Sequence, residues 1–499
     1  MANRLTIYFT SDTHGYLYPS NFCDTQPRGM GLLSMRFPKD GNTLVIDGGD
    51  SLQGSPLTYY CHTQQKPMPI AHAMNQRGYD FVTLGNHDFN YGYDNLADYL
   101  SQLNAQCLCA NVTDKTGALP ILPYAVRTME NGLRVGVVGI TTHWITVWEK
   151  PENLTNFQIR SPVEAVRPLV SRLREQVDVL IGVYHGGYEK DLRTGAPLSD
   201  TDENQACRLC EEYPFDLLLT GHQHAALAGA KWAGAHLVQT PCNAAAYARV
   251  ELDENGAFHS QLVIPPDTAL LDDEQRALWA AVNQWLDRPI GHLSHPLWPG
   301  EKLEMALHSS PIANFFNQVQ LEASGADASC TALPNSLRGF DSAVTVRDVV
   351  ASYVYSNTLV VLRVTGDTLR RALEQCASYF DVAADGGVSV AKPFLLPKEA
   401  HFNYDYFSGI AYGFDLRKPV GRRVFELSFR GRPVRPQDSL TLCMSNYRAT
   451  GAGDFPFYRD CPRVKEIQTE ISELILNYFL AHPYVEAPDA PGYRVIPPE

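Results

Sequence analysis

The sequence has no long hydrophobic run and no excess of basic residues. It contains no stretch of about 18 or more apolar residues, so we predict no membrane span. Lys and Arg number 41 against 55 Asp and Glu, which leaves a formal net charge of −14. This balance argues against broad surfaces for nucleic-acid polymers or anionic membranes. A small anionic substrate remains compatible with it, because bound metal ions reverse the local field.

Cysteine forms no dense framework. The 11 cysteines are spread over 499 residues, and the close pairs are Cys107/Cys109 and Cys207/Cys210. A lone C-x-x-C pair holds zinc only when a second pair joins it, so we expect ordinary reduced thiols. We recognise no signal-peptide pattern before the strand expected from Leu5. We therefore expect a cytoplasmic protein, or an exported one if a leader has been removed.

Five short runs rich in β-branched and aromatic residues each end in a polar cluster. They are LTIYFT before SDTHG (11–15), TLVIDG before GD (49–50), DFVTL before GNHD (85–88), DVLIGVY before HGG (185–187) and FDLLLT before GHQH (221–224). Helix-like stretches with apolar residues at three- and four-residue spacing lie between most of them. Such alternation predicts an α/β fold whose strands are covered by helices on both faces. In open α/β sheets, sites form beyond the carboxyl ends of the strands.

The chain is long enough for several domains, and its pattern of alternating strand-like and helix-like segments changes near residue 265. We predict a catalytic domain over residues 1–265 and a connecting helix within 266–299. A second domain follows over residues 300–499. It contains few ionisable clusters, so we expect it to recognise the substrate.

The polar clusters together predict a metal centre. Imidazole and oxygen ligands without a thiolate suit zinc, manganese or iron. Seven ligands exceed what one tetrahedral ion accepts and fit two divalent ions that share a carboxylate, with Asp50 as the natural bridge. One histidine at a strand end is usually a structural hydrogen-bonding group, but five clusters at five strand ends are not explained by packing. The candidate ligands are Asp12, His14, Asp50, Asn86, His185, His222 and His224.

The motifs SDTHG, GGDSLQGSP, GNHDFNYG, YHGGYE and GHQH resemble the five signature blocks of calcineurin-like metallophosphoesterases, in the same order. GDSLQGSP narrows the resemblance to the 5′-nucleotidase and cyclic-nucleotide phosphodiesterase group. The resemblance implies a four-layer β-sandwich with flanking helices, followed by a smaller α/β nucleotide-binding domain. It also implies a division of the ligands between the two ions. The first ion takes Asp12, His14, Asp50 and His224, and the second takes Asp50, Asn86, His185 and His222.

His87 is not a ligand in this assignment. It resembles the catalytic histidine of the family, which stabilises charge on the phosphate or protonates the leaving oxygen. Many relatives carry an Asp four residues after the Asn to orient this histidine, and this sequence has Asn90 there. Asn90 accepts a hydrogen bond but cannot stabilise an imidazolium as a carboxylate does. Asp88 is the alternative partner, or else it anchors the loop.

Two aromatic stretches in the second half suggest base recognition: HFNYDYFSGIAYGFDL (401–416) and NYRATGAGDFPFY (446–458). Rings from two loops can sandwich a flat base, although alternating aromatic residues also form strand cores. The resemblance implies Tyr404 and Phe455 as the stacking rings. It also implies that Arg338 reaches the substrate phosphate and that Asn335 helps to hold it. PNSLRG lacks the two glycines of the corresponding family block.

These features predict a dinuclear-metal phosphoesterase acting on nucleotides. NYRATGAGDF with Arg448 and GNHDFN with Asn90 resemble the 2′,3′-cyclic-nucleotide 2′-phosphodiesterase/3′-nucleotidase branch more than the 5′-nucleotidases, and this resemblance favours that branch. The alternative is a 5′-nucleotidase/UDP-sugar hydrolase, which keeps every ligand and differs in the substrate pocket. A third possibility is a metal- or nucleotide-binding protein without turnover. We predict a small nucleotide as the partner, with no nucleic-acid polymer and no membrane, and we make no prediction of oligomeric state.

Overall fold

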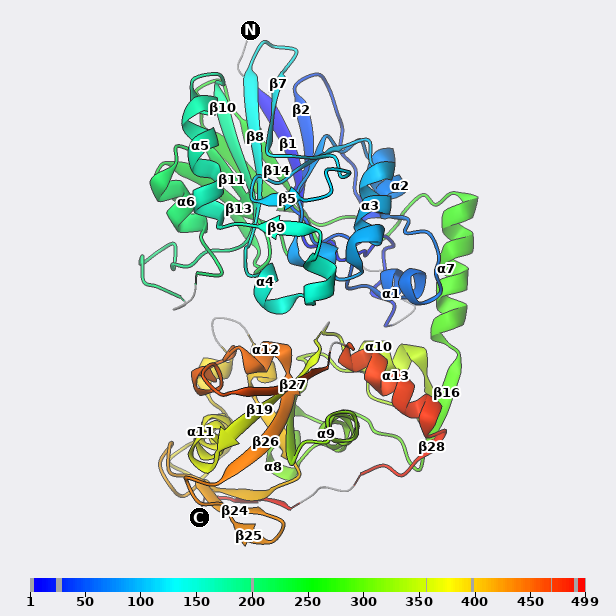
Figure 1. Ribbon diagram of the computed structural model, residues 1–499, viewed down its shortest axis with the longest axis vertical. Helices are drawn as coiled ribbons and strands as arrows, with labels where there is room; N and C mark the ends of the chain where they lie inside the picture. Colours follow the sequence, from blue (N-terminus) through cyan, green and yellow to red (C-terminus); the bar gives the residue numbers. More distant parts are fainter. Residues whose placement is uncertain are drawn as a thin grey trace. The chain divides into compact units, whose positions relative to one another are not determined.

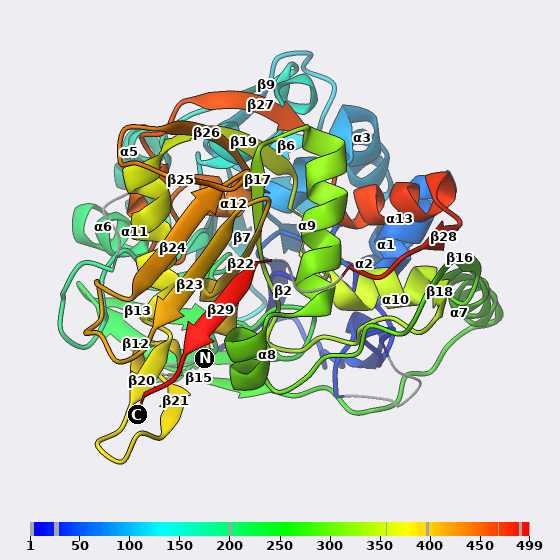
Figure 2. The ribbon, with the colours of Figure 1, turned by 90° about the horizontal axis from the view of Figure 1, so that it is seen from below.

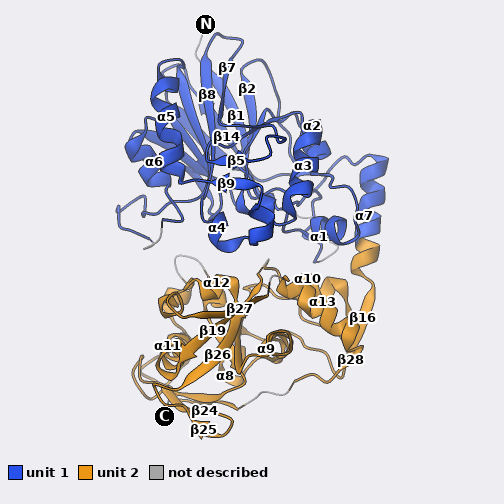
Figure 3. Ribbon diagram, in the orientation of Figure 1, with its two compact units in different colours: residues 1–282 blue, residues 283–499 orange. Residues whose placement is uncertain are grey.

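The computed structural model describes residues 4–23, 29–198, 202–355, 357–395, 399–467, 469–488 and 492–498. The chain divides into two compact units, residues 1–282 (unit 1) and residues 283–499 (unit 2), coloured separately in Figure 3. The division falls inside helix α7 (Asp273–Leu286), within the segment that the sequence predicts as a connecting helix. Among the described residues, no helix combines the length and the hydropathy needed to span a membrane.

Unit 1 contains two large sheets. The seven-stranded sheet has the order β15 (Phe258–Val263), β14 (Tyr247–Leu252), β1 (Leu5–Thr10), β2 (Thr43–Asp47), β3 (Phe81–Val82), β4 (Gln106–Leu108) and β6 (Ile121–Leu122). The six-stranded sheet has the order β12 (Leu227–Trp232), β13 (Ala235–Gln239), β11 (Leu217–Thr220), β10 (Val179–His185), β8 (Arg134–Thr141) and β7 (Tyr124–Thr128).

Alternating apolar residues pack the two sheets of unit 1 face to face. Ile7 and Phe9 of β1 lie in one buried cluster with Val135 and Val137 of β8. Val138, on the opposite face of β8, packs in a second cluster with residues of α5 (Pro162–Arg174) and α6 (Ala206–Glu212). Helices α2 (Ile70–Gln76) and α3 (Gly92–Gln102) lie on the side of the seven-stranded sheet (Figure 1). The predicted four-layer sandwich with flanking helices is therefore confirmed.

Strand direction explains where polar side chains gather in unit 1. The central strands β1, β2, β3 and β4 are mutually parallel, and so are β8, β10, β11 and β13. The antiparallel strands β14, β15, β12 and β7 lie towards the sheet edges. The carboxyl ends of the parallel strands in each sheet therefore open at one end of that sheet, which is where α/β folds place their sites.

Unit 2 is the smaller α/β unit. Its five-stranded sheet has the order β22 (Asp405–Ser408), β17 (Ala328–Ala332), β26 (Ser439–Ser445), β19 (Leu359–Thr365) and β27 (Arg463–Ile467). Helix α9 (Pro311–Ser324) packs against β17 and β22, and α11 (Gly366–Ala377) packs against β19. Figure 2 shows a further sheet of this unit, in which β24 (Val424–Phe429), β23 (Ala411–Asp415) and β29 (Tyr493–Ile496) lie side by side.

Candidate active site

The loops after five parallel strands of unit 1 carry the candidate metal ligands. His185 is the last residue of β10, and the others closely follow the ends of β1, β2, β3 and β11. Five of them have φ between 49° and 69°, a region that non-glycine residues rarely adopt. Backbone strain of this kind gathers at functional sites, where the surrounding structure enforces it. The five are Asp12, His14, Asp50, His222 and His224.

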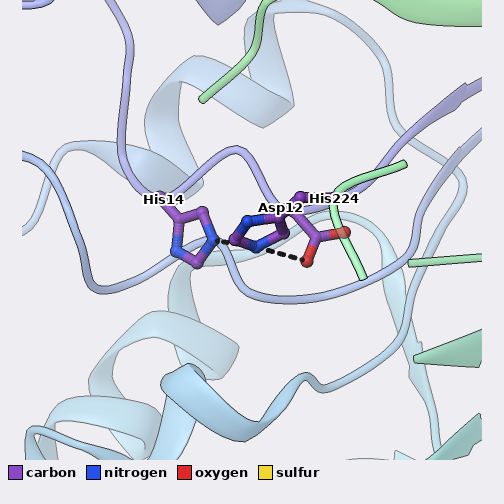
Figure 4. Close-up of side chains that lie close together, drawn as sticks. All are labelled: Asp12, His14 and His224. Carbon is purple, nitrogen blue, oxygen red and sulfur yellow. Dashed lines mark hydrogen bonds and ion pairs between the residues drawn. The ribbon is translucent and has the colours of Figure 1, made fainter. Parts of the chain in front are cut away.

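The first group of converging side chains is Asp12, His14 and His224 (Figure 4). His14 Nε2 lies 3.1 Å from His224 Nε2, and His224 Nε2 lies 3.4 Å from Asp12 Oδ1. Asp12 and His14 are buried, whereas His224 is partly open to solvent. Two imidazole nitrogens and a carboxylate oxygen that all lie within 4.8 Å of one another form a donor set of the kind that zinc and similar ions accept.

The second group is Asp12, Asp50 and His185, all of them buried. His185 Nε2 lies 3.2 Å from Asp50 Oδ2. Within the part of the chain that the structure describes, neither of these two atoms has a hydrogen-bond partner. Buried polar atoms are ordinarily satisfied, so an orphaned carboxylate oxygen facing an orphaned imidazole nitrogen indicates a position for a cation. Asp12 belongs to both groups.

Hydrogen bonds behind three histidines fix which ring nitrogen faces the site. His14 Nδ1 lies 2.8 Å from the carbonyl oxygen of Gln53, and His185 Nδ1 lies 2.7 Å from that of Gly48. A carbonyl only accepts, so both rings donate Nδ1–H and turn Nε2 towards the site. This orientation by partners behind the ligand is typical of metal-binding histidines.

His222, the third of these histidines, is held in the opposite sense. Its Nε2 lies 2.9 Å from Glu203 Oε1, and its Nδ1 lies 2.9 Å from Asn86 Oδ1. A carboxylate accepts the Nε2–H, which leaves the Nδ1 lone pair beside the amide oxygen of Asn86. Sequence reasoning missed Glu203, because it lies in a loop with no strand or helix pattern to mark it.

The charge states of the two carboxylates and of His14 suit metal binding. Burial lowers the pKa of His14 to about 4, so this ring is neutral at pH 7. Burial raises the pKa of Asp12, but the hydrogen bond from His224 and the charge of His185 outweigh it and bring it to about 2. Burial likewise opposes ionisation of Asp50, yet the charge of His185 holds the pKa of that carboxyl well below its usual range. Anionic carboxylates and neutral imidazole are the forms that bind metals. Burial lowers the pKa of His185, but the charge of Asp50 outweighs it and raises this pKa to about 9, so His185 must release a proton to bind an ion.

His87 lies beside the cluster. Its ring centroid is 5.3 Å from that of His14, and its backbone N–H donates to Asp50 Oδ1 at 2.7 Å. Its Nδ1 lies 2.7 Å from Asn90 Oδ1. The Asp88 carboxylate instead accepts hydrogen bonds from the backbone N–H groups of residues 50, 51, 52 and 85. Of the two partners considered for His87, the structure pairs it with Asn90, and Asp88 anchors the loops.

The polar residues predicted for phosphate contact in unit 2 have protein partners. Arg338 Nε donates to Asp348 Oδ1 at 2.8 Å, and the Arg338 side chain is still about 40% exposed. Asn335 Nδ2 donates to the carbonyl oxygen of Glu399 at 2.7 Å, and Asn335 Oδ1 accepts from the N–H of His401 at 3.1 Å. Asn335 therefore links two loops, and part of the Arg338 side chain is exposed.

The two rings predicted to stack on a base are buried. Tyr404 is 2% exposed and Phe455 is 0% exposed. The Phe455 ring lies parallel to that of Tyr458, and the Arg448 guanidinium sits 4.2 Å from its centroid. A stacking ring needs a face open to the ligand, so the structure does not support Tyr404 and Phe455 in that role. These aromatic residues form core, as the other interpretation of the two stretches allows.

A cavity of about 270 Å³ nevertheless opens beside these stretches in unit 2. The buried ion pair between Arg448 and Asp405, 2.9 Å apart, forms part of its wall. Both quoted stretches contribute to the cavity, through Phe402 and Tyr447 in place of the predicted rings. Its lining residues are Cys330, Thr331, Ala332, Tyr353, Tyr355, Asn357, Phe402, Asp405, Ser445, Tyr447 and Arg448.

Family models match two parts of the chain. The model described as calcineurin-like phosphoesterase matches residues 5–226, and that of the 5′-nucleotidase C-terminal domain matches residues 289–460. A Staphylococcus aureus protein with a proposed assignment as 5′-nucleotidase, solved in complex with α-ketoglutarate, is 34% identical. The match covers 99% of this chain and 100% of that one, with a TM-score of 0.85.

Two curated bacterial proteins are more distant relatives. The 2′,3′-cyclic-nucleotide 2′-phosphodiesterase/3′-nucleotidase of Haemophilus influenzae is 24% identical over 96% of this chain and 84% of its own length. The trifunctional nucleotide phosphoesterase YfkN of Bacillus subtilis is 24% identical over 96% of this chain but only 38% of its own length. The chain thus spans little more than a third of that protein. Together these matches show that the chain belongs to the 5′-nucleotidase family of calcineurin-like phosphoesterases.

Proposed function

We propose that this protein hydrolyses phosphate esters of nucleotides at a dinuclear metal centre in unit 1, with 2′,3′-cyclic nucleotides and 3′-nucleotides as substrates. The orphaned, buried pair Asp50 Oδ2 and His185 Nε2 carries the metal-centre part of the proposal. The Haemophilus influenzae relative, matched over most of both chains, supports the choice of substrate.

The residues divide into two ligand sets that share Asp50. The first ion would be held by Asp12, His14, Asp50 and His224, and three of these form the first group of converging side chains. The second would be held by Asp50, Asn86, His185 and His222. When bound, a pair of divalent ions polarises the phosphate and makes a nucleophile available near neutral pH.

His87 contributes the proton chemistry. Its Nδ1 is held by Asn90, so Nε2 is the ring nitrogen left for the substrate. In its charged form the ring stabilises negative charge developing on the phosphate oxygens. It also donates its Nε2 proton to the ribose oxygen that leaves. None of its ring atoms is needed to complete the ligand sets.

Unit 2 recognises the nucleoside. Its cavity is walled by aromatic rings, among them Tyr355, Phe402 and Tyr447, and by the buried Arg448–Asp405 pair. Aromatic faces stack on any base, and a few fixed polar groups give orientation. Arg338, with its guanidinium partly exposed, is the candidate for an anionic group of the substrate.

One observation favours a second function, that of a 5′-nucleotidase. The Staphylococcus aureus protein with that proposed assignment is 34% identical over nearly the whole of both chains, more than the cyclic-nucleotide enzymes are. Both functions use the same metal centre and differ in which phosphate ester of the nucleotide is cleaved.

A substrate panel tests the proposal. The pure full-length protein is loaded with Mn²⁺ and assayed for phosphate release from 2′,3′-cyclic AMP, 3′-AMP, 5′-AMP and UDP-glucose, with a coupled phosphatase for the cyclic ester and for UDP-glucose. We expect the highest kcat/KM for the first two. A higher kcat/KM for 5′-AMP would show that the protein is a 5′-nucleotidase and not a 2′,3′-cyclic-nucleotide phosphodiesterase/3′-nucleotidase. If the metal-loaded protein hydrolyses none of these esters and does not hydrolyse p-nitrophenyl phosphate, it is a metal- or nucleotide-binding protein without turnover.

A further inference from the structure

The carboxylate of Glu149 lies directly behind the partner of His87. Asn90 Nδ2 donates a short hydrogen bond to Glu149 Oε2, and Asn90 Oδ1 lies 2.7 Å from His87 Nδ1. Glu149 is buried, and it follows helix α4 (Ile145–Trp148) in a segment 59 residues from Asn90 in the sequence. Imidazole, amide and carboxylate therefore form one continuous chain that begins beside the metal cluster.

Glu149 is surrounded by donors. Its Oε1 accepts from the backbone N–H of Lys150 at 2.7 Å and from Asn153 Nδ2 at 2.9 Å, while its Oε2 accepts from Asn90. Asn153 Nδ2 also donates to the backbone carbonyl of Asn90 at 3.1 Å. All the groups that face the Glu149 carboxylate are thus hydrogen-bond donors. They are satisfied only if both oxygens of the side chain act as acceptors.

This arrangement fixes the direction of every bond in the chain. An isolated Asn90 amide could present either its oxygen or its NH₂ to His87. Because Glu149 accepts only, the NH₂ group of Asn90 must face Glu149 and its oxygen must face His87. His87 Nδ1 then carries the proton, and Nε2 is directed to chemistry. The negative charge of Glu149 also polarises the amide and strengthens its oxygen as an acceptor.

We propose that Glu149 is a positioning residue that sets the orientation and tautomer of His87 through Asn90. This proposal rests on the proposed function, because it takes from it the catalytic role of His87. The family resemblance places a carboxylate next to the histidine, but position 90 carries an asparagine. Glu149 supplies a carboxylate that reaches the histidine through Asn90. Asn90 and Glu149 together replace a directly bonded Asp.

Glu149→Gln is the informative single change, since it keeps the shape and removes one acceptor. The side chain of a glutamine has only one oxygen, so its NH₂ group must face either Asn90 or the pair of donors formed by Lys150 and Asn153. If its oxygen keeps Lys150 and Asn153, Asn90 must turn its amide and present NH₂ to His87. We expect kcat for the best nucleotide to fall about 10- to 100-fold, with KM and the bound-metal content unchanged.

The rescue variant is the double exchange Asn90→Asp with Glu149→Gln. The carboxylate introduced at position 90 then accepts both from His87 Nδ1–H and from the NH₂ group introduced at position 149. The amide oxygen at position 149 keeps its bonds from Lys150 and Asn153. We expect kcat within about threefold of the wild type, which corresponds to less than about 0.7 kcal/mol. Glu152→Gln is the matched control, because Glu152 is exposed in the same short segment and should leave kcat unchanged.

A second measurement does not depend on turnover. In Zn²⁺-loaded protein with ¹⁵N-labelled histidine, the His87 signals are those missing from His87→Ala. The spectra are recorded at a pH high enough for the ring to be neutral, where we expect Nδ1–H in the wild type and in the double exchange, and Nε2–H in Glu149→Gln. An unchanged tautomer, an unchanged kcat in Glu149→Gln, or a double exchange no better than Glu149→Gln would overturn the proposal. If the wild type shows the expected tautomers but hydrolyses no ester, the proposed function fails and this inference stands.

Discussion

Asp88 Oδ2 accepts a hydrogen bond from the backbone N–H of Asp50, 2.9 Å away, and so connects the His87 loop to the loop that carries Asp50. The same carboxylate accepts from the N–H of Ser51 at 2.8 Å and of Gly85 at 2.8 Å. Asp88 is buried, and its burial together with the charge of Asp50 raises its pKa to about 6. The acidic residue next to His87 therefore acts on the loops that carry the candidate ligands and not on the histidine.

Asp88→Asn should weaken metal binding. An asparagine in this place turns an NH₂ group towards backbone donors, so at least one bond that holds the Asp50 loop is lost. We expect metal affinity to fall about 10- to 100-fold by calorimetric titration with Mn²⁺. Asp94→Asn, at an exposed position in the following helix, is the control. Wild-type affinity in Asp88→Asn would show that these backbone contacts do not position the ligands.

His87→Ala should keep both ions and lose turnover. The substitution removes the imidazole but leaves the backbone N–H that donates to Asp50 Oδ1. Removing a proton-transfer group commonly costs about 10²- to 10⁴-fold, and we expect kcat to fall within this range. Metal content by plasma emission should match the wild type. Loss of an ion in this variant would mean that His87 is a ligand.

The metal cluster could be predicted from sequence because its signal is local and repeated. Each candidate ligand stands at or shortly after the end of an apolar run, and parallel strands bring such ends to one edge of a sheet. His185 and His222 illustrate this, since they stand at the ends of the parallel neighbours β10 and β11 and their ring centroids lie 5.5 Å apart. The contact between His14 and His224, 210 residues apart in the sequence, joins loops of the two different sheets and depends on how those sheets pack.

The supporting residues could not be predicted in the same way. Glu149 and Glu203 lie in loop segments without periodicity, and their partners come from loops distant in the sequence. In unit 2 both predicted stretches contribute to the cavity, but through Phe402 and Tyr447, while Tyr404 and Phe455 are buried. Tyr404 is adjacent to the strand β22 and turns into the core, while Phe402, in a short 3₁₀ turn, lines the cavity. Alternation along a strand does not extend through such a turn.

Asp47 should make the stability of unit 1 depend on pH. Burial raises the pKa of this carboxyl to about 7, from an ordinary value of 3.8. The folded state therefore holds the proton more tightly than the unfolded state, and stability falls as pH rises between these two values. Asp47→Asn removes this titration. Relative to the wild type, the variant should gain about 1.4 kcal/mol for each pH unit up to about pH 7.

The measurement for Asp47 is the melting temperature of unit 1 by calorimetry, for wild type and variant, from about pH 5 to about pH 8 with saturating metal. The difference between the two proteins should widen up to about pH 7 and then stay constant. Asp178→Asn is the contrast, because a hydrogen bond from Arg134 lowers the pKa of Asp178 to about 2. Its difference from the wild type should not vary over this range. A constant difference for Asp47→Asn would show that Asp47 is ionised throughout.

Phe402→Ala and Tyr447→Ala should each weaken nucleotide binding without affecting the chemistry. Both rings line the cavity of unit 2, and a base stacked on an aromatic ring loses about 1–3 kcal/mol when that ring is removed. We expect KM for the best nucleotide to rise about tenfold. Hydrolysis of p-nitrophenyl phosphate, which carries no nucleobase, should be unchanged. Tyr484→Ala removes an exposed ring elsewhere in unit 2 and should alter neither substrate. If the two cavity variants bind nucleotides as the wild type does, the base lies elsewhere and the cavity has another role.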